Sequence, residues 1–407
     1  MAIRLLFAVL LTITQAAYAG VLQEAIDNAP EGSTLVLGKG TYRGNIVINK
    51  QINIDGIDGG AVIVGDGTGT VITVNSSYVT LQNLSVRGSG DNHDFIDSCI
   101  AVKNADVVKI HDNKISDCLF GVNLEQVNRS VVENNRIESK PFSLGLRGDG
   151  IRLWYSHLNV IRSNISNNVR DTVFWYSSGN QIESNTVTNS RYSLHFMYAD
   201  RNVVYNNTFN GNSVGAFFMF SHSSRVQKNK MLRGVGAFGI GIGMKECSDF
   251  LITDNTVLYN ARGMYVDQSP HQPGMTNIYN NNQVMYNSVG IQFHGTTIES
   301  SFEGNTFKGN ITDLSNNSLE SKLELNKWLM NDWDAYEGFD FDGDGFGDTP
   351  MVVMSYADSI WQYRPSAKFF YGTPALSLLD FLARLLPFSE PQILGVDEKP
   401  VMERTYE

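Results

Sequence analysis

The sequence predicts an all-β fold: a right-handed parallel β-helix in which each coil is one repeat of the chain. Triplets that begin with asparagine recur at a spacing of 22 residues, most clearly at 185–187, 207–209 and 229–231. An internal period of this length is typical of solenoids. Short apolar runs of alternating polarity, rich in Val, Ile and Phe, follow the triplets and leave no room for an amphipathic helix between them. Coils made only of strands and turns indicate a β-helix.

The recurring asparagine is expected to have a structural role. Asparagine tolerates the left-handed backbone that a sharp corner needs, and stacked amides can hydrogen-bond along a ladder. We therefore predict an asparagine ladder and not a binding site at these positions.

The chain is expected to contain four segments. Residues 1–19 are typical of a secretion signal, because Arg4 precedes an apolar run over 5–13 and an A-x-A cleavage site over 17–19. Residues 20–325 form the β-helix, and an amphipathic helix over 21–29 caps its open end. Residues 326–370 form a C-terminal cap with an Asp-rich loop, and 371–407 form an amphipathic helix and tail. The signal predicts a secreted or periplasmic protein.

The charge and the cysteines limit the function further. The net charge is −11, and removal of the predicted signal takes away one more positive charge. An acidic chain without a basic cluster is a poor nucleic-acid binder, and its charge argues weakly against long acidic polysaccharides. Cys99 and Cys118 are almost one coil apart, so either a disulfide or two buried thiols is expected, and Cys247 is left over.

Alternation along the strands separates inward from outward side chains. When the strands are aligned on a glycine or its equivalent, the side chains one and three places later are apolar throughout and should fill the core. The side chains two and four places later should face outward: Asn123, Arg152, His195, Phe217, Tyr265, Gln292, and Glu125, Trp154, Met197, Met219, Asp267, His294. The glycine-rich stretch 239–244 is expected to leave its backbone open beneath a ligand or partner.

The outward row predicts either a packing surface or a site for a soft metal. Met197 and Met219 are expected on adjacent coils, with His195 on the same face and His222 in the following turn. Thioether and imidazole together favour Cu(I). The alternative is that this row packs under a loop or against another protein.

A carbohydrate-active enzyme is the rival prediction, because other parallel β-helices cleave or epimerise polysaccharides. Asp149, Arg152, Trp154 and His157 could form a sugar platform. Such chemistry needs paired carboxylates or a base beside a cation, and no second carboxylate is evident from the sequence. A turn aspartate and a surface arginine are therefore the preferred interpretation.

The acidic stretch near the C-terminus has two interpretations. Four aspartates have the spacing of positions 1, 3, 5 and 9 of a calcium loop: Asp340, Asp342, Asp344 and Asp348. Position 12 is Met351, so the pattern is not a complete EF-hand. The turn either binds calcium or hydrogen-bonds to itself.

Four segments make the chain resemble the NosD family of periplasmic maturation factors for nitrous-oxide reductase. They are 192–199 (YSLHFMYA), 239–245 (GIGIGMK), 263–270 (GMYVDQSP) and the tail from Trp333 to Pro350. The resemblance extends over nearly the whole mature chain. Met351 departs from the aromatic residue expected after Pro350, which affects only the packing of the cap.

The resemblance implies a non-catalytic accessory protein at the inner membrane. Such proteins work with the ABC transporter pair NosF and NosY and the copper chaperone NosL, and help to deliver copper to the copper–sulfide centre of the reductase NosZ. It therefore implies a transient Cu(I) site. The candidate ligands are His195, Met197 and Met219, then His222 and Met244.

The final helix supplies a docking candidate. Residues 374–387 are amphipathic, and one side carries Leu378, Leu379, Leu382, Leu385 and Leu386. We expect this side to dock on the transporter, and expect removal of 374–407 to leave the β-helix folded. A metal-free protein-binding scaffold remains a third function class.

Overall fold

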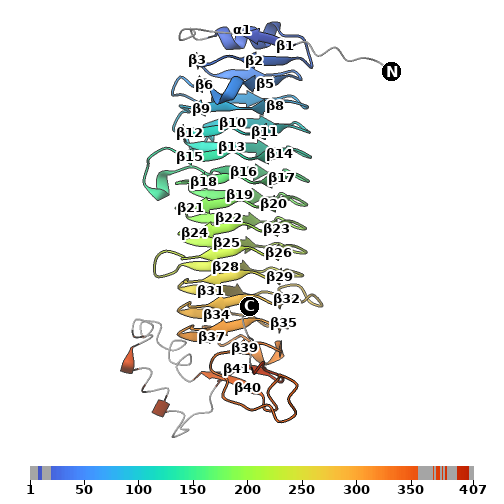
Figure 1. Cartoon of the computed structure of the whole chain (residues 1–407), viewed down its shortest axis with the longest axis vertical. Coiled ribbons are helices and arrows are strands. Elements are labelled where there is room, and N and C mark those ends of the chain that lie inside the picture. The colour runs from blue at the N-terminus through green and yellow to red at the C-terminus, as the bar shows by residue number, and fades with distance from the viewer. Residues whose placement is uncertain are drawn as a thin grey trace, which may run out of the picture. The chain divides into compact units, whose positions relative to one another are not determined.

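Three parallel sheets make up each of the two compact units of the protein. The computed structural model describes residues 8–11, 20–355, 370, 373–375, 378, 381–382 and 392–402. The units are Met1–Thr208 and Phe209–Glu407, and the division falls within strand β24 (Thr208–Asn210). Successive coils add one strand to each sheet in turn (Figure 1). This arrangement confirms the predicted parallel β-helix.

Unit 1 contributes long runs of hydrogen-bonded neighbours to all three sheets. The first sheet contains β1 (Ala8–Leu11), β2 (Thr34–Leu37), β5 (Asn53–Gly56), β8 (Thr80–Gln82), β11 (Lys109–His111), β14 (Val131–Glu133), β17 (Val160–Arg162), β20 (Gln181–Glu183) and β23 (Val203–Tyr205). The second contains β3 (Gly40–Arg43), β6 (Ala61–Val64), β9 (Leu84–Arg87), β12 (Lys114–Cys118), β15 (Arg136–Ser139), β18 (Ile165–Asn167) and β21 (Thr186–Thr188). The third contains β4 (Ile46–Ile48), β7 (Ile72–Val74), β10 (Ser98–Lys103), β13 (Phe120–Glu125), β16 (Ile151–Trp154), β19 (Asp171–Trp175) and β22 (Tyr192–Met197).

Unit 2 repeats the same plan. Its first sheet contains β26 (Arg225–Gln227), β29 (Leu251–Thr253), β32 (Asn277–Asn280), β35 (Ser300–Glu303), β38 (Lys327–Leu329), β41 (Gln392–Asp397) and β40 (Met351–Ser355). Its second contains β27 (Lys230–Leu232), β30 (Thr256–Leu258), β33 (Gln283–Met285), β36 (Thr306–Lys308) and β39 (Asp332–Trp333). Its third contains β25 (Val214–Met219), β28 (Ile240–Lys245), β31 (Arg262–Asp267), β34 (Val289–His294) and β37 (Thr312–Asn316). β40 and β41 pair antiparallel.

The third sheet confirms the predicted inward side chains, whereas two of the predicted outward ones, Asn123 and Gln292, are only 1% and 7% exposed. Every predicted inward side chain is at most 2% exposed, from Val122 on β13 to Phe293 on β34. Two strands were left out of the predicted alignment, however. β19 has no glycine at its start, and the glycine-rich backbone of β28 was predicted to lie open. Gly243 on β28 does face outward, but a Cβ there would lie 2.3 Å from the Phe217 ring, so that ring covers the backbone expected to be open. The prediction of an open backbone was therefore wrong at this position.

Asparagine ladders run through the interior of both units, as predicted. In unit 1, each of Asn135, Asn164, Asn185 and Asn207 accepts two hydrogen bonds from the preceding asparagine, one from its backbone N–H and one from its side-chain amide, at 2.9–3.1 Å. In unit 2, Asn255, Asn282, Asn305 and Asn331 do the same at 2.9–3.0 Å. The prediction that the ladder asparagine itself turns the corner was wrong. The residue before it has the left-handed backbone, as Asn134 does with φ 54°, and this turns the following side chain inward.

The N-terminal helix caps unit 1, as predicted. α1 (Val21–Asn28) buries Leu22 and Ile26. Its Gln23 side chain exchanges two hydrogen bonds with the backbone of Val47 on β4, at 2.7 and 3.0 Å, and so takes the place of a neighbouring strand. Lys50 donates to the carbonyls of Asp27 and Ala29 near the end of the helix. Within the predicted signal, the described residues are those of β1, which pairs with β2, and the cleavage site lies outside the described residues.

The C-terminal end of unit 2 is closed by β41. Leu394 is fully buried, and Asp397 accepts hydrogen bonds from the backbone and side chain of Asn331 at 2.9 and 2.8 Å. Asp397 thus occupies the next position of the asparagine ladder. The indole of Trp333 also donates to this carboxylate at 3.1 Å. Residues 374–407 therefore contain part of the core, so their removal should destabilise unit 2.

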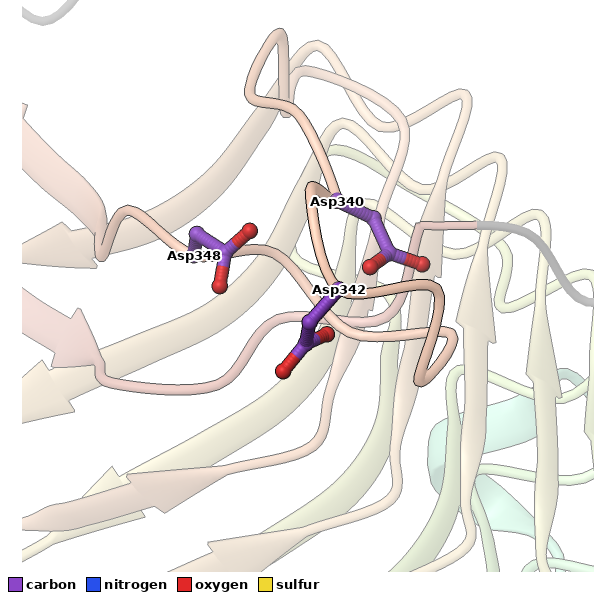
Figure 2. Close-up of side chains that lie close together, drawn as sticks. All are labelled: Asp340, Asp342 and Asp348. Carbon is purple, nitrogen blue, oxygen red and sulfur yellow. The ribbon is translucent and has the colours of Figure 1, made fainter.

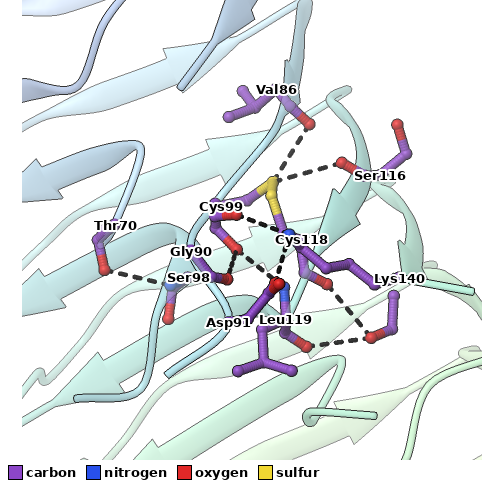
Figure 3. The surroundings of a disulfide bond; sticks show 12 residues. Thr70, Val86, Gly90, Asp91, Ser98, Cys99, Ser116, Cys118, Leu119 and Lys140 are labelled. Carbon is purple, nitrogen blue, oxygen red and sulfur yellow. Dashed lines mark hydrogen bonds and ion pairs between the residues drawn. A yellow bond between two sulfur atoms is a disulfide. The ribbon is translucent and has the colours of Figure 1, made fainter. Parts of the chain in front are cut away.

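Cys99 and Cys118 form a disulfide, which resolves the alternative that the sequence left open. It joins β10 to β12 across 19 residues, with the two Cα atoms 5.5 Å apart (Figure 3). Cys247 is buried and takes no part in this disulfide, and its thiol donates a hydrogen bond to the carbonyl of Lys245 at 3.4 Å. Within the residues that the structure describes, three short 3-10 helices lie in the connections: η1 (Ile57–Gly59), η2 (Leu144–Leu146) and η3 (Leu323–Leu325). η2 lies in the connection between β15 and β16.

Candidate functional site

The outward face of β16, β19 and β22 brings together aromatic, basic and sulfur-containing side chains of unit 1. The strand register places Arg152, Val173 and His195 in one row. A second row contains Trp154, Trp175 and Met197. The two indoles meet edge to face, with centroids 5.8 Å apart. Side chains that are i and i+2 on a strand share a face, so His195 and Met197 point to the same side of β22, as predicted.

His195 is enclosed by aromatic rings. Tyr192 stacks on its imidazole with centroids 4.9 Å apart, and Trp175 meets it at 5.9 Å in a T-shaped arrangement. Burial lowers the pKa of His195 below the ordinary value of 6.5, while the charge of Asp171 opposes this shift and those of Arg191 and Arg170 reinforce it. The imidazole is therefore neutral at neutral pH, which is the form that binds a metal.

A buried ionic network supports the turns before these strands. Asp149 is 2% exposed and accepts two hydrogen bonds from Arg170, at 2.9 and 3.1 Å. Asp171 is 1% exposed and accepts hydrogen bonds from the Arg191 side chain and from the backbone N–H of Tyr192 at 3.1 Å. Burial raises the pKa of Asp149 to about 6, with Arg170 lowering it and Asp171 raising it. The network fixes the backbone where β22 begins.

Asp171 is the second carboxylate near Asp149 that was not evident from the sequence. Asp171 was missed because it begins the coil that lacks a glycine. Both carboxylates are nevertheless enclosed and paired with arginines, whereas a general acid or base has to reach its substrate. His157 is also engaged, because its Nδ1 accepts a hydrogen bond from the backbone of Ser178 at 3.1 Å. The geometry therefore does not favour the predicted sugar platform as a catalytic site.

The remaining copper candidates belong to unit 2. Met219 ends β25 and is half-buried, opposite Lys245 of β28. His222 follows in the turn and pairs with Ser248 in an isolated bridge. Met244 differs, because it is 1% exposed and its sulfur accepts a hydrogen bond from the Tyr279 hydroxyl at 3.1 Å. The structure thus places Met244 in the core and away from the outward row.

Other outward positions of unit 2 carry charged groups. Lys245, Asp267 and His294 lie in register on β28, β31 and β34. Burial raises the pKa of Tyr265, a neighbour of Asp267, to about 12. His294 shares a hydrogen bond of 2.7 Å with the Asn317 side chain. The nitrogen and oxygen atoms of this row are harder metal ligands than the thioether of Met197 on β22.

The Asp-rich loop brings three of its four predicted ligands together. Carboxylate oxygens of Asp340, Asp342 and Asp348 all lie within 4.8 Å of one another (Figure 2). Asp344 is not part of this group, and its carboxylate accepts from the backbone of Phe346 at 2.9 Å. Asp340 accepts backbone N–H groups of the same turn, and the hydrogen bond from Gly345 holds its pKa below the ordinary value. These contacts belong to the self-bonded turn, and calcium binding stays a prediction.

The docking leucines are described only in part. Leu378 and Leu382 are 55% and 43% exposed, and Phe381 between them is 56% exposed. The predicted docking residues Leu379, Leu385 and Leu386 lie outside the described residues. In the part of the chain that the structure describes, no helix combines the length and the apolar character needed to cross a membrane.

Solved structures similar to this chain are parallel β-helix proteins of diverse activity. The A-module of the mannuronan C-5 epimerase AlgE6 from Azotobacter vinelandii has a TM-score of 0.58 and 16% identity, covering 74% of this chain and 93% of its own. The catalytic unit of a GH87 α-1,3-glucanase from Streptomyces thermodiastaticus has a TM-score of 0.62 and 16% identity, covering 74% and 62%. The Streptococcus pneumoniae surface adhesin PfbA has a TM-score of 0.55 and 12% identity, covering 82% and 92%. Such low identities show a shared fold alone.

Sequence comparisons are more specific. The chain is 28% identical over 364 residues to a protein of Pseudomonas aeruginosa named probable ABC transporter binding protein NosD, covering 86% of this chain and 84% of that protein. The family model described as periplasmic copper-binding protein (NosD) matches residues 133–338, which is half of the chain and includes β16 to β34. The chain therefore belongs to the NosD family of periplasmic copper-binding proteins.

Proposed function

We propose that this protein carries Cu(I) on the outward face of β22 and hands it on during assembly of the copper–sulfide site of nitrous-oxide reductase. The observation that carries this proposal is the pair His195 and Met197, which share one face of β22. Both side chains are half-buried, and the imidazole is neutral at neutral pH because burial lowers its pKa. An imidazole and a thioether favour Cu(I) over hard cations.

A small number of ligands suits a carrier protein, which has to release its ion. Two protein donors hold an ion less tightly than a closed site of three or four, and a partner can complete the site during transfer. Met219 and His222 of unit 2 offer a second pair of the same donor types. We propose that copper is the cargo of the protein, with NosL as its source and NosZ as its recipient, and that the chain has no catalytic activity of its own.

Cu(I) titration against a competing chelator, without oxygen, tests this function. The wild type is expected to bind, and the His195→Ala/Met197→Ala variant to lose at least about 100-fold in affinity, or about 2.8 kcal/mol. A Met219→Ala/His222→Ala variant measures the second pair. Lys245→Ala/His294→Ala is the matched control, because it alters the same outward face of the fold at harder groups. A wild type that does not bind Cu(I) would contradict the carrier function.

We also propose that the protein docks on the NosF–NosY transporter through the exposed leucines near the C-terminus. The name of the Pseudomonas relative supports a transporter partner, and Leu378 and Leu382 are four residues apart and 55% and 43% exposed. Leu378→Ser/Leu382→Ser should reduce co-purification with the transporter while leaving Cu(I) affinity unchanged. This variant replaces the longer deletion, because that deletion would remove β41. Unchanged co-purification would contradict this docking surface.

A further inference from the structure

Trp175 lies beside the proposed copper donors and has no role in that proposal. It faces outward on β19, in register with Met197 of β22, and its ring centroid lies 5.9 Å from that of His195. The imidazole and the indole are nearly perpendicular, with an interplanar angle of 87°. The indole therefore borders the space that both donors face.

The orientation of the indole is set from its other side. The guanidinium of Arg152 lies over the Trp175 ring, with Cζ 5.9 Å from its centroid. Arg152 belongs to β16, and the strands follow the order β16, β19, β22. The indole thus has a cation over its ring on the coil before it, and the imidazole of His195 lies beside it on the coil that follows.

Neighbouring residues hold these groups in place. Arg152 donates to Asn123 at 3.0 Å and also lies over Trp154, with Cζ 5.1 Å from that centroid. Trp154 packs edge to face against Trp175, and Tyr192 covers one face of the imidazole. Both the indole and the imidazole are therefore kept in position before any ligand arrives, which lowers the cost of binding.

We propose that Trp175 covers the copper ion held by His195 and Met197 with the face of its indole, and so acts as a specificity residue for Cu(I). This inference rests on the proposed function. The electron-rich face of an indole attracts a cation most strongly when that cation is poorly hydrated. The ring also occupies space in which water or a further hard ligand would bind, and Cu(II) prefers such ligands in a tetragonal arrangement. The result is a site that favours Cu(I) and yet uses only two protein donors.

Tryptophan fluorescence during Cu(I) titration tests this role directly. The chain contains five tryptophans, and single variants separate their signals. Wild-type fluorescence should be quenched as Cu(I) binds, and Trp175→Phe should remove most of that quenching. Trp328→Phe is the control, because this indole belongs to the core at β38, and the variant should keep the quenching. Thermal melts of both variants show whether the fold is retained.

Affinity provides the second measurement. Phenylalanine attracts cations more weakly than tryptophan, and leucine has no aromatic ring to attract them. The affinity for Cu(I) should therefore be highest in the wild type, lower in Trp175→Phe and lowest in Trp175→Leu, with a total loss of about three- to tenfold. The role of Trp175 is overturned if both Trp175 variants bind Cu(I) as tightly as the wild type and Trp175→Phe keeps the quenching. The carrier function stands in that case if His195→Ala/Met197→Ala still loses affinity for Cu(I). A wild type that binds no Cu(I) would overturn both the role of Trp175 and the carrier function.

Discussion

The interior and the outward face of the same coils differ in how far they repeat. Inside, the ladder from Asn113 to Asn207 uses one residue type and one pair of hydrogen bonds on every coil of unit 1 that it crosses. Outside, one row of β-strand positions carries Glu125, Trp154, Trp175 and Met197 in succession. The interior has to satisfy the same backbone groups on each coil, because buried polar groups need partners. The outward side chains have no such constraint, so their chemistry is free to follow function.

This comparison predicts that interior changes alter stability and outward changes alter copper binding. The largest effect is expected at the C-terminal end. Deletion of 374–407 removes the buried Leu394 and the Asp397 carboxylate that completes the ladder. Burial of one leucine and the hydrogen bonds of a buried carboxylate together contribute roughly 5 kcal/mol. The deletion should lower the unfolding free energy by that order in urea, whereas Leu378→Ser/Leu382→Ser should change it little. A deletion variant as stable as the wild type would show that β41 is dispensable.

The next largest effect is expected within the ladder of unit 1. Asn164 accepts two hydrogen bonds from Asn135 and donates to Val132 and Asn185. Asn164→Ala leaves several buried groups without partners, which should lower the unfolding free energy by about 4 kcal/mol. Urea unfolding measures this change. Asn167→Ala, at a partly exposed position of β18, is the control and should cost less than about 1 kcal/mol. Similar losses for both variants would contradict the structural role of the ladder.

The disulfide should contribute slightly less. It closes a loop of 19 residues, for which loss of chain entropy in the unfolded state predicts about 3 kcal/mol. Cys99→Ala/Cys118→Ala should therefore unfold at lower urea concentration than the wild type. Cys247→Ala serves as the control because this cysteine is also buried but takes no part in the disulfide. Cu(I) affinity of the double variant should match that of the wild type, and a parallel loss of affinity would link the disulfide to the site.

The smallest effect concerns pH and the outward face. Burial lowers the pKa of His195, so its imidazole stays neutral at pH values where an exposed histidine is already protonated. Since copper binds the neutral form, affinity should decline as pH falls, with a midpoint below 6.5 and by at most about tenfold per pH unit. Chelator competition at several pH values measures this curve. The same curve in His195→Ala should lack this decline. A midpoint at or above 6.5 would contradict the described environment of His195.

The sequence by itself determined the coil architecture of each unit. The asparagine period and the alternation of polarity placed the inward side chains correctly wherever a glycine or its equivalent marked the start of the strand, as at Gly150 and Ser193. These signals are local, because each coil buries the same kinds of residues at the same positions. The pairing of His195 with Met197 on one face followed from the same alternation.

Only the tertiary structure decided which groups surround those two side chains. Asp171 and Trp175 lie on a coil without the glycine signal, so their approach to Asp149 and His195 depends on strand register. Met244 lies in the core because β28 is an ordinary strand, and Asp397 completes the ladder from 66 residues beyond Asn331. Contacts between coils and between distant segments depend on register and burial, and these are properties of the folded chain that no single repeat contains.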